Sequence, residues 1–276
     1  MIDHDQTPRR IRLTIAYEGS GFSGWQSQPA GDAVQDHVQR AIAAILGKPS
    51  ALHGSGRTDA GVHALGQVAH FDLPPTHRMD GGAWLRALNT KLPRQIRIVD
   101  AAVVDTDFHA RFSATGKHYR YEIVVADVLP PFDHLRAWHQ RGPLDLAAMH
   151  EACRILTGEH DFSAFCANRN DGTDRVPGSG DNVRHVTSIT PLESALDHLP
   201  GTRITLDFRG NGFLYKMVRL MTGAIVRCGQ HKLTTTELTA MLDRERLAAQ
   251  HAAGGVEKSP LCAPADGLTL VSVDYS

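Results

Sequence analysis

Lysine, cysteine and long apolar runs are all scarce in this sequence of 276 residues. No apolar stretch approaches the roughly 20 residues that a membrane-spanning helix needs, and the polar N-terminus lacks the apolar core of a secretory signal. We therefore expect a soluble, cytoplasmic protein that contacts no membrane. At roughly 150 residues per domain, the length fits about two domains or one large one.

The four cysteines lie far apart and form no C-x-x-C pair, which excludes a zinc ribbon and gives no support to a disulfide framework. Cys153 and Cys228 fall at apolar positions of expected helices, so we expect buried free thiols there. The 16 histidines contain no H-E-x-x-H pattern, although metal ligands must cluster at a fitting spacing. The sequence therefore predicts no metal site.

Positive and negative charge nearly cancel, with 29 lysines and arginines against 30 acidic residues, which on average argues against a nucleic-acid partner. Arginine supplies 23 of these 29 cations, and three stretches without any acid, 81–99, 108–121 and 208–236, are rich in cations. The second stretch interleaves its cations with aromatic residues, as surfaces that bind phosphates and unstacked bases do. On charge alone, a solvated surface with patchy charge remains the simpler interpretation.

Hydrophobic periodicity predicts an α+β protein whose two halves are related. In the first half, alternating apolar residues predict a strand over 11–17, and helical spacing predicts a helix over 34–46 that ends at Gly47. The second half repeats this order in the segments 119–125 (strand), 146–156 (helix), 204–208 (strand), 213–228 (apolar helix) and 268–273 (strand).

We expect each half to form one domain, residues 1–107 and residues 108–276. Each domain is expected to pack helices on one face of a mainly antiparallel sheet. The segment 168–182 is rich in glycine, proline and charge and predicts a mobile surface loop.

The segment 19–24 spells G-x-G-x-x-G after the first expected strand. A dinucleotide-binding fingerprint must open directly into a helix whose N-terminus holds the pyrophosphate. Here Trp25, Gln26 and Pro29 intervene, and the helix starts only near Val34. We therefore reject a dinucleotide site and expect a structural loop that brings Trp25 close to another segment.

The densest chemical signal is the segment 54–63, GSGRTDAGVH. Its glycines allow a close backbone approach, and Arg57 and Asp59 place a cation and a carboxylate in one tight loop. A carboxylate in a partly dry pocket becomes a usable nucleophile or base only if a neighbour keeps it ionised, and an arginine does this. A turn with a surface ion pair is the competing interpretation of any lone Arg-x-Asp.

A second signal is the pair Lys216 and Arg219, three residues apart in a strongly apolar helical segment. A cation in such a segment either extends to solvent or meets an anion. The spacing alone does not decide between these two alternatives.

Six blocks of sequence resemble the tRNA pseudouridine synthase A family, in order and over nearly the whole chain. They are YEGSGFSGWQ, GRTDAGVHALGQVAHF, DFHARFSATGKHYRY, GEHDFSAF, NGFLYKMVRLMTG and APADGL. The block GRTDAGVHA alone is highly diagnostic of this family.

The resemblance implies roles for five residues. Asp59 matches the aspartate that attacks the target uridine, so that the glycosidic bond breaks and the base rotates and rejoins through C5. Whether the attack falls on the base or on the sugar stays open. Tyr119 matches the tyrosine that stacks on the flipped uracil, and Arg57 matches the arginine that supports base flipping. Arg219 is expected to pair with Asp59 and keep it ionised, and Leu268 to line the uracil pocket.

The resemblance also implies the substrate, the partners and the fold. Family members modify uridines at positions 38, 39 and 40 in the anticodon arm of tRNA, work as homodimers with basic clefts, and need no cofactor or metal. The implied pseudouridine synthase fold has two α+β domains that share a central antiparallel sheet. The near-zero net charge is low for a tRNA-binding protein, so we expect localised arginines or partly protonated histidines to carry the affinity.

Two alternatives come from other functional classes. An RNA chaperone would bind tRNA without chemistry, and the presence of Arg57, Asp59 and Tyr119 speaks against it. A carboxylate-dependent nucleoside or glycoside hydrolase usually needs two acidic groups, and no second acid stands out near Asp59.

Overall fold

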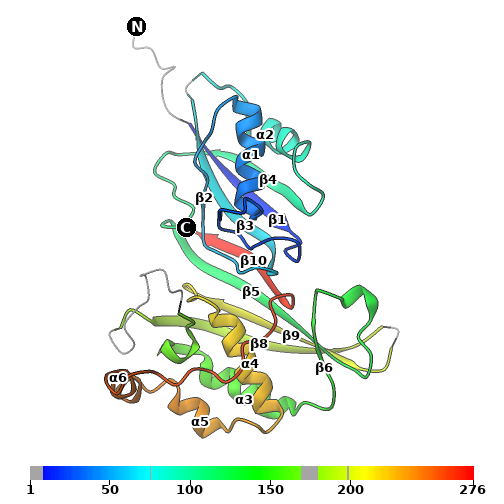
Figure 1. The fold of residues 1–276 in the computed structure, drawn as a ribbon, viewed down its shortest axis with the longest axis vertical. Coiled ribbons are helices and arrows are strands. Elements are labelled where there is room, and N and C mark those ends of the chain that lie inside the picture. Colours follow the sequence, from blue (N-terminus) through cyan, green and yellow to red (C-terminus); the bar gives the residue numbers. More distant parts are fainter. Residues whose placement is uncertain (1–8, 75, 169–179, 198) are drawn as a thin grey trace. The chain divides into compact units, whose positions relative to one another are not determined.

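The computed structural model describes residues 9–74, 76–168, 180–197 and 199–276. The chain divides into two compact units (Figure 1). Unit 1 contains the described residues up to Thr115 together with Thr269–Ser276, and unit 2 contains the described residues of Gly116–Leu268. The expected division after residue 107 places the C-terminus in the second domain. The structure groups Thr269–Ser276 with unit 1, because this segment pairs with a strand of that unit.

The sheet of unit 1 has the strand order β4-β1-β3-β10. Strand β1 (Arg9–Tyr17) pairs antiparallel with β3 (His63–Leu73) and with β4 (Ile96–Val104). Strand β10 (Leu268–Tyr275) pairs parallel with β3, and the short β2 (His53–Gly54) pairs antiparallel with β3. Alternate residues of β1 are buried, as the predicted strand over 11–17 requires.

The helices α1 (Val34–Leu46) and α2 (Gly81–Asn89) lie beside this sheet (Figure 1). Helix α1 has the bounds that its periodicity predicts, and Gly47 ends it in the left-handed region at φ 73°. Helix α2 begins where the Asp80 side chain accepts a hydrogen bond from the Ala83 amide. The ring of Trp84, buried on α2, meets Phe71 of β3 edge-on at 4.9 Å, so the helix and the sheet share one core.

The sheet of unit 2 has the strand order β5-β9-β8-β7. These strands are antiparallel and span Ala114–Val125 (β5), Thr202–Gly210 (β9), Val183–Ala195 (β8) and Gly158–Asp161 (β7). The short β6 (Trp138–Gln140) pairs parallel with β5. Residues 169–179 of the loop expected over 168–182 lie outside the described residues.

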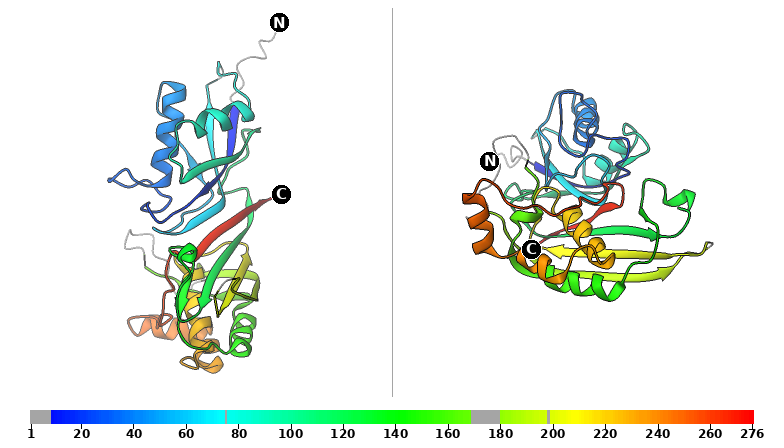
Figure 2. Two further views of the ribbon diagram at one scale, coloured as in Figure 1. Left: turned by 90° about the vertical axis from the view of Figure 1, so that its right-hand side faces the viewer. Right: turned by 60° about the horizontal axis from the view of Figure 1, so that its bottom comes forward.

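Figure 2 shows the helices of unit 2 gathered on one side of its strands. Helix α3 packs against α4, α5 and β8. The helical elements are α3 (Leu146–Leu156), α4 (Met217–Gly229), α5 (Thr235–Ala240), α6 (Arg244–Ala252) and the short 3-10 turns η1 (Pro131–Asp133) and η2 (Ser163–Phe165). Each unit therefore combines a mainly antiparallel sheet with helices, and the predicted α+β class is confirmed.

Helix α4 begins at Met217, and the predicted start at Phe213 is wrong. Lys216 has a left-handed backbone with φ 59°, which the interior of an α-helix does not accommodate, so it precedes the helix as its N-cap. Arg219 lies within the helix. The two cations therefore do not both lie within the helix, as the predicted helix over 213–228 would require.

In the part of the chain that the structure describes, no helix is both long and apolar enough to cross a bilayer. All four cysteines lie among the described residues and are in the thiol form, and Cys153 and Cys228 are buried as predicted. Burial raises the pKa of the Cys153 thiol to about 12 and that of Cys228 to about 11, so both thiols stay protonated at neutral pH.

Candidate active site

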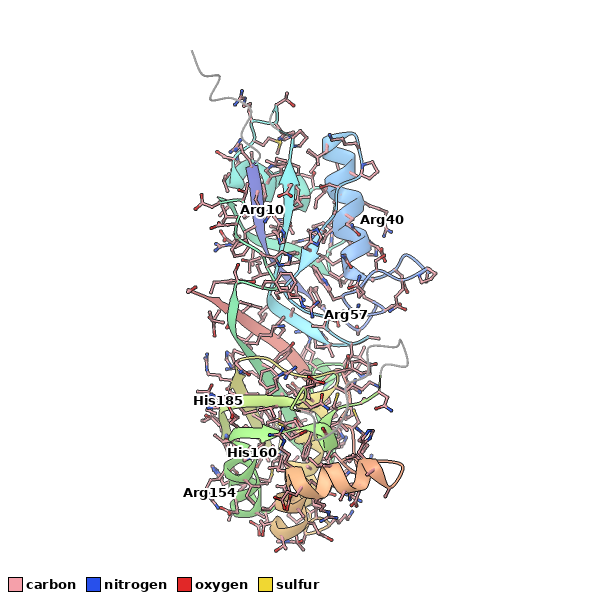
Figure 3. The ribbon with its side chains drawn as sticks, turned by 90° about the vertical axis from the view of Figure 1, so that its left-hand side faces the viewer. Arg10, Arg40, Arg57, Arg154, His160 and His185 are labelled. Atoms are coloured by element: carbon pink, nitrogen blue, oxygen red, sulfur yellow. The ribbon has the colours of Figure 1, made fainter. Side chains whose placement is uncertain are left out.

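Arg57 and Asp59 lie in the loop that joins β2 to β3 in unit 1, where Figure 3 labels Arg57. Arg57 is exposed, Thr58 is buried, and Asp59 is partly exposed. The residue between the two charges therefore anchors the loop, while the carboxylate stays within reach of a ligand.

A buried glutamine fixes the first part of this loop. Gln67 of β3 accepts a hydrogen bond from the Ser55 hydroxyl at 2.7 Å and donates to the Gly56 carbonyl at 3.0 Å. The Ser55 amide donates to the Val68 carbonyl at 2.8 Å. Because Ser55 and Gln67 are buried, a displaced loop would leave polar groups unpaired, at a cost of about 1–3 kcal/mol for each. These bonds hold the loop in one conformation.

Thr58 ties the loop to the end of β1 and to the glycine-rich segment that follows it. Its hydroxyl shares a buried hydrogen bond of 2.8 Å with the Tyr17 hydroxyl, and its carbonyl accepts from the Trp25 amide at 3.1 Å. Burial raises the pKa of Tyr17, so the phenol stays neutral. Gly24 packs against the same carbonyl with φ 92°, and a Cβ there would lie 2.5 Å from the Thr58 oxygen.

The segment 19–24 thus supports the Asp59 loop. This agrees with the prediction of a structural loop that brings Trp25 close to another segment. Its other end holds the start of β3, since the Gly19 amide donates to Nδ1 of the buried His63 at 3.0 Å. The Glu18 carboxylate lies 3.5 Å from the same nitrogen. Within the loop, the Val62 amide donates to the Asp59 carbonyl at 3.2 Å and closes a turn directly after the carboxylate.

In unit 2, Tyr119 lies on β5 opposite Phe208 of β9. Its side chain is 8% exposed, and its ring meets Phe213 edge-on at 5.4 Å with an interplanar angle of 88°. Packing between aromatic rings therefore sets the orientation of Tyr119.

Arg219 of α4 holds the segment 263–268. Its Nε donates to the Ala263 carbonyl at 2.8 Å, and the Ala263 amide donates to the Arg219 carbonyl at 3.1 Å. The two residues form a reciprocal pair between the helix and the segment that leads into β10. Arg219 therefore has a positioning contact in unit 2 that its spacing in the sequence does not reveal.

Tyr121 of β5 supports the same segment from the sheet. Its hydroxyl donates to the Pro264 carbonyl at 2.8 Å, and a Cβ at Gly267 would lie 2.7 Å from the tyrosine ring. The Glu122 amide donates to the Gly267 carbonyl at 2.9 Å. Leu268 follows directly and is 5% exposed, so its position depends on these contacts.

The structure places Arg57 and Asp59 together in unit 1, and Tyr119, Arg219 and Leu268 in unit 2. The pairing of Arg219 with Asp59 stays a prediction. Sequence reasoning missed the supporting roles of Tyr17, Gln67 and Tyr121. Gln67 offered a signal, because it is a polar residue within a strand whose neighbours are mostly apolar.

Among the described residues, no three histidines, cysteines or carboxylates are grouped so that they could hold a metal ion. The arrangement in unit 1 instead offers one carboxylate on a rigid loop. A carboxylate held in this way can serve as a nucleophile or as a base.

Comparisons with known proteins agree over nearly the full length. The model of the family described as tRNA pseudouridine synthase matches residues 13–113 and 152–276. The tRNA pseudouridine synthase A of Akkermansia muciniphila is 47% identical over 266 residues, which cover 96% of this chain and 95% of that protein. The proteins of the same name from Syntrophotalea carbinolica and Brevibacillus brevis are 42% and 41% identical, with 96% and 97% of this chain and 96% and 100% of the relatives covered.

Proposed function

This chain belongs to the tRNA pseudouridine synthase family, whose members are isomerases, and we propose that it acts on the anticodon stem-loop of tRNA with Asp59 as its nucleophile. The target uridines are those at positions 38, 39 and 40. The enzyme works as a cytoplasmic homodimer and needs no cofactor or metal.

The reaction is an isomerisation, so no atom is gained or lost overall. The Asp59 carboxylate forms a covalent bond to the target nucleotide, at the base or at the sugar, and the bond between N1 and C1′ breaks. The uracil rotates, C5 bonds to C1′, and the bond to Asp59 is released. The proton on C5 leaves to a base, and N1 takes up a proton.

The observation that carries this proposal is the construction of the loop around Asp59. Three neighbouring segments hold the loop by hydrogen bonds, two of them buried, while Asp59 itself is partly exposed. A nucleophile that is fixed before the substrate binds loses little freedom at the moment of reaction. A surface ion pair between Arg57 and Asp59 would not need this support.

The remaining residues serve binding and orientation. Tyr119 stacks on the flipped uracil, which returns roughly 1–3 kcal/mol of the few kcal/mol that flipping costs. Arg57 supports flipping from its exposed position beside the nucleophile. Arg219 is the proposed ionic partner of the Asp59 carboxylate. Leu268 lines the pocket for the uracil.

The test is to map pseudouridine on an unmodified tRNA transcript that carries uridines at positions 38 to 40. After incubation with the purified protein, the RNA is treated with a carbodiimide that leaves a stable adduct on pseudouridine, and primer extension locates the adducts. We expect stops that are confined to the anticodon arm.

Other results would change the account in defined ways. Stops outside the anticodon arm would keep the reaction and overturn the assigned positions. Release of free uracil would indicate a hydrolase. Tight tRNA binding without any stop would indicate an RNA chaperone.

A further inference from the structure

Phe112 is a large apolar side chain that unit 1 leaves in solvent, with 76% of its surface exposed. It lies in the loop between β4 and β5. An exposed phenylalanine by itself needs no explanation. The surroundings of Phe112 distinguish it, because its ring is the outermost member of a group of aromatic rings.

The rings behind Phe112 come from two strands and from its own loop. The His109 ring lies 4.3 Å from the Phe112 ring, between centroids, at an angle of 31°. His109 in turn contacts His70 of β3 at 4.7 Å, and His70 stacks on His53 of β2 at 5.0 Å. Phe112 is thus supported from the protein side by a cluster of three imidazoles in mutual contact.

Hydrogen bonds hold this loop in place. The amides of Arg111 and Phe112 donate to Nδ1 of His109 at 3.1 and 3.3 Å, and the Ala110 amide donates to Nδ1 of His70 at 3.1 Å. The Ala110 carbonyl accepts from the Tyr275 hydroxyl at 2.7 Å. Three successive amides therefore have an imidazole nitrogen as their acceptor, and these bonds fix the backbone that carries the exposed ring.

The imidazoles must be neutral to accept these bonds through Nδ1. Burial, together with the neighbouring Arg10, His109 and His53, lowers the pKa of His70 to about 4. Burial and nearby cationic groups also lower the pKa of His109. The lowered pKa of His70 and of His109 keeps these two rings uncharged at neutral pH.

One cation lies beside the exposed ring, and a second, paired with Asp72, binds the base of its loop. The Arg111 guanidinium lies 5.7 Å from the centre of the Phe112 ring, on one face. Arg10, labelled on β1 in Figure 3, donates to the Phe108 carbonyl at the base of the loop at 2.6 Å. The chain has no acidic residue from Phe108 to Tyr121. A rigid aromatic ring beside a guanidinium offers both a stacking surface for a base and a charge for its phosphate.

We propose that Phe112 is a stacking platform for an unpaired base of the RNA substrate, outside the pocket for the target uridine, with Arg111 contacting the adjoining phosphate. The proposal rests on the proposed function, because that function makes RNA the partner. A base has an aromatic face and a nearby negative charge, which match the ring and the cation of this loop.

A second exposed phenylalanine provides the matched control. Phe132 of unit 2 is 92% exposed in the turn η1, and no described aromatic ring or cation contacts it. Removal of either side chain takes an exposed ring from the surface and should leave the fold intact. Only the removal of the Phe112 side chain should weaken the binding of RNA.

The experiment measures the affinity of the full chain for an unmodified tRNA transcript by fluorescence anisotropy. We expect Phe112→Ala and Phe112→Leu each to weaken binding by at least about five-fold, the lower end of what one stacked base contributes. Leucine keeps the apolar surface but lacks the aromatic face. Phe112→Trp should bind as tightly as the wild type, and Phe132→Ala should leave the affinity unchanged.

A fully paired, blunt-ended RNA duplex distinguishes stacking from contacts to the backbone. It offers no unpaired base, so Phe112→Ala should bind it as the wild type does. Equal weakening toward the duplex would overturn the platform. So would wild-type tRNA affinity in Phe112→Ala or Phe112→Leu, or a change of oligomeric state in Phe112→Ala during sedimentation, which would indicate a protein interface.

Measurements on the wild-type protein distinguish a failure of this proposal from a failure of the proposed function. If the wild type forms pseudouridine and Phe112→Ala binds tRNA equally well, the platform alone fails. If the wild type binds no tRNA, the proposed function fails and the platform fails with it.

Discussion

Asp59 and Tyr119, the two residues given the central chemical roles, are held in different ways. Asp59 lies in an irregular loop of unit 1 that depends on buried hydrogen bonds from Tyr17, Gln67 and Trp25. Tyr119 lies on a regular strand of unit 2, among aromatic rings. Hydrogen bonds hold the loop of Asp59, and aromatic packing contributes to holding the ring of Tyr119.

This difference follows from what each role requires. A nucleophile must be accessible, so its loop cannot be covered by an apolar core and needs directional bonds from beneath. A stacking ring needs a fixed plane, which neighbouring rings provide. The geometry of the two positions should therefore be disturbed by different substitutions: by loss of single hydroxyls in unit 1, and by loss of ring volume in unit 2.

Among the residues that accompany the nucleophile, the largest effect on turnover is expected from loss of the Tyr119 hydroxyl. Tyr119→Phe keeps the ring and its packing, so tRNA affinity should stay at the wild-type value. If the hydroxyl assists removal of the proton from C5, turnover should fall by about 100-fold. Single-turnover kinetics and anisotropy measure the two quantities separately. Full activity would confine Tyr119 to stacking and packing.

Loss of the hydrogen bond between Tyr17 and Thr58 should have a smaller effect on turnover and should also lower stability. Tyr17→Phe and Thr58→Val each leave the other hydroxyl buried without its partner, which should lower the free energy of unfolding by about 1–3 kcal/mol. The double variant should cost less than the sum of the single ones, because the two groups share one interaction. Urea unfolding of the four proteins measures this coupling.

The Tyr17 and Thr58 variants also allow their turnover to be compared with that of the Tyr119 variant. Turnover should fall by about ten-fold while tRNA affinity stays unchanged, since a displaced Asp59 loses reaction rate before binding. Thr58→Ser keeps the hydroxyl and should restore most of the activity. Wild-type turnover in Tyr17→Phe would show that the bond stabilises the fold without positioning the carboxylate.

The smallest effect concerns His70 of unit 1, whose pKa is lowered by burial. The pKa of His70 is lowered to about 4, from an ordinary value of 6.5, by burial and by Arg10, His109 and His53, against the opposing effect of Asp72. Between these two values the unfolded chain binds more protons than the folded one, so stability falls as the pH falls through this range. Above pH 6.5 the contribution of His70 is complete.

An NMR titration of the His70 ring should give a midpoint near pH 4. The variant His70→Asn keeps an acceptor but does not titrate, so its stability should depend less on pH between 6.5 and 4 than that of the wild type. An ordinary midpoint for His70, or an unchanged pH dependence in the variant, would contradict the account of this group.

Local sequence signals predicted the regular elements well. The strand over 11–17, the helix over 34–46 and its end at Gly47 follow from periodicity and capping, which act within a few residues. The start of α4 could not be predicted in this way, because apolar periodicity continues through Lys216 while the backbone there is left-handed.

Contacts between segments that are distant in the sequence could not be predicted from local signals either. The pairing of β10 with β3 joins the end of the chain to its first third. The bond between Tyr17 and Thr58 spans 41 residues. The roles of Asp59 and Arg57 came from the resemblance to a family, whereas the bonds that hold their loop became visible only in the structure.

The measurement that tests the central role of Asp59 most directly is a comparison of the wild type with Asp59→Asn, which has nearly the same shape but carries no charge. The account predicts that Asp59→Asn binds an unmodified tRNA transcript and unfolds in urea as the wild type does. Its single-turnover rate of pseudouridine formation should fall below about one thousandth of the wild-type rate. Substantial product from Asp59→Asn would contradict the assignment of Asp59 as the nucleophile.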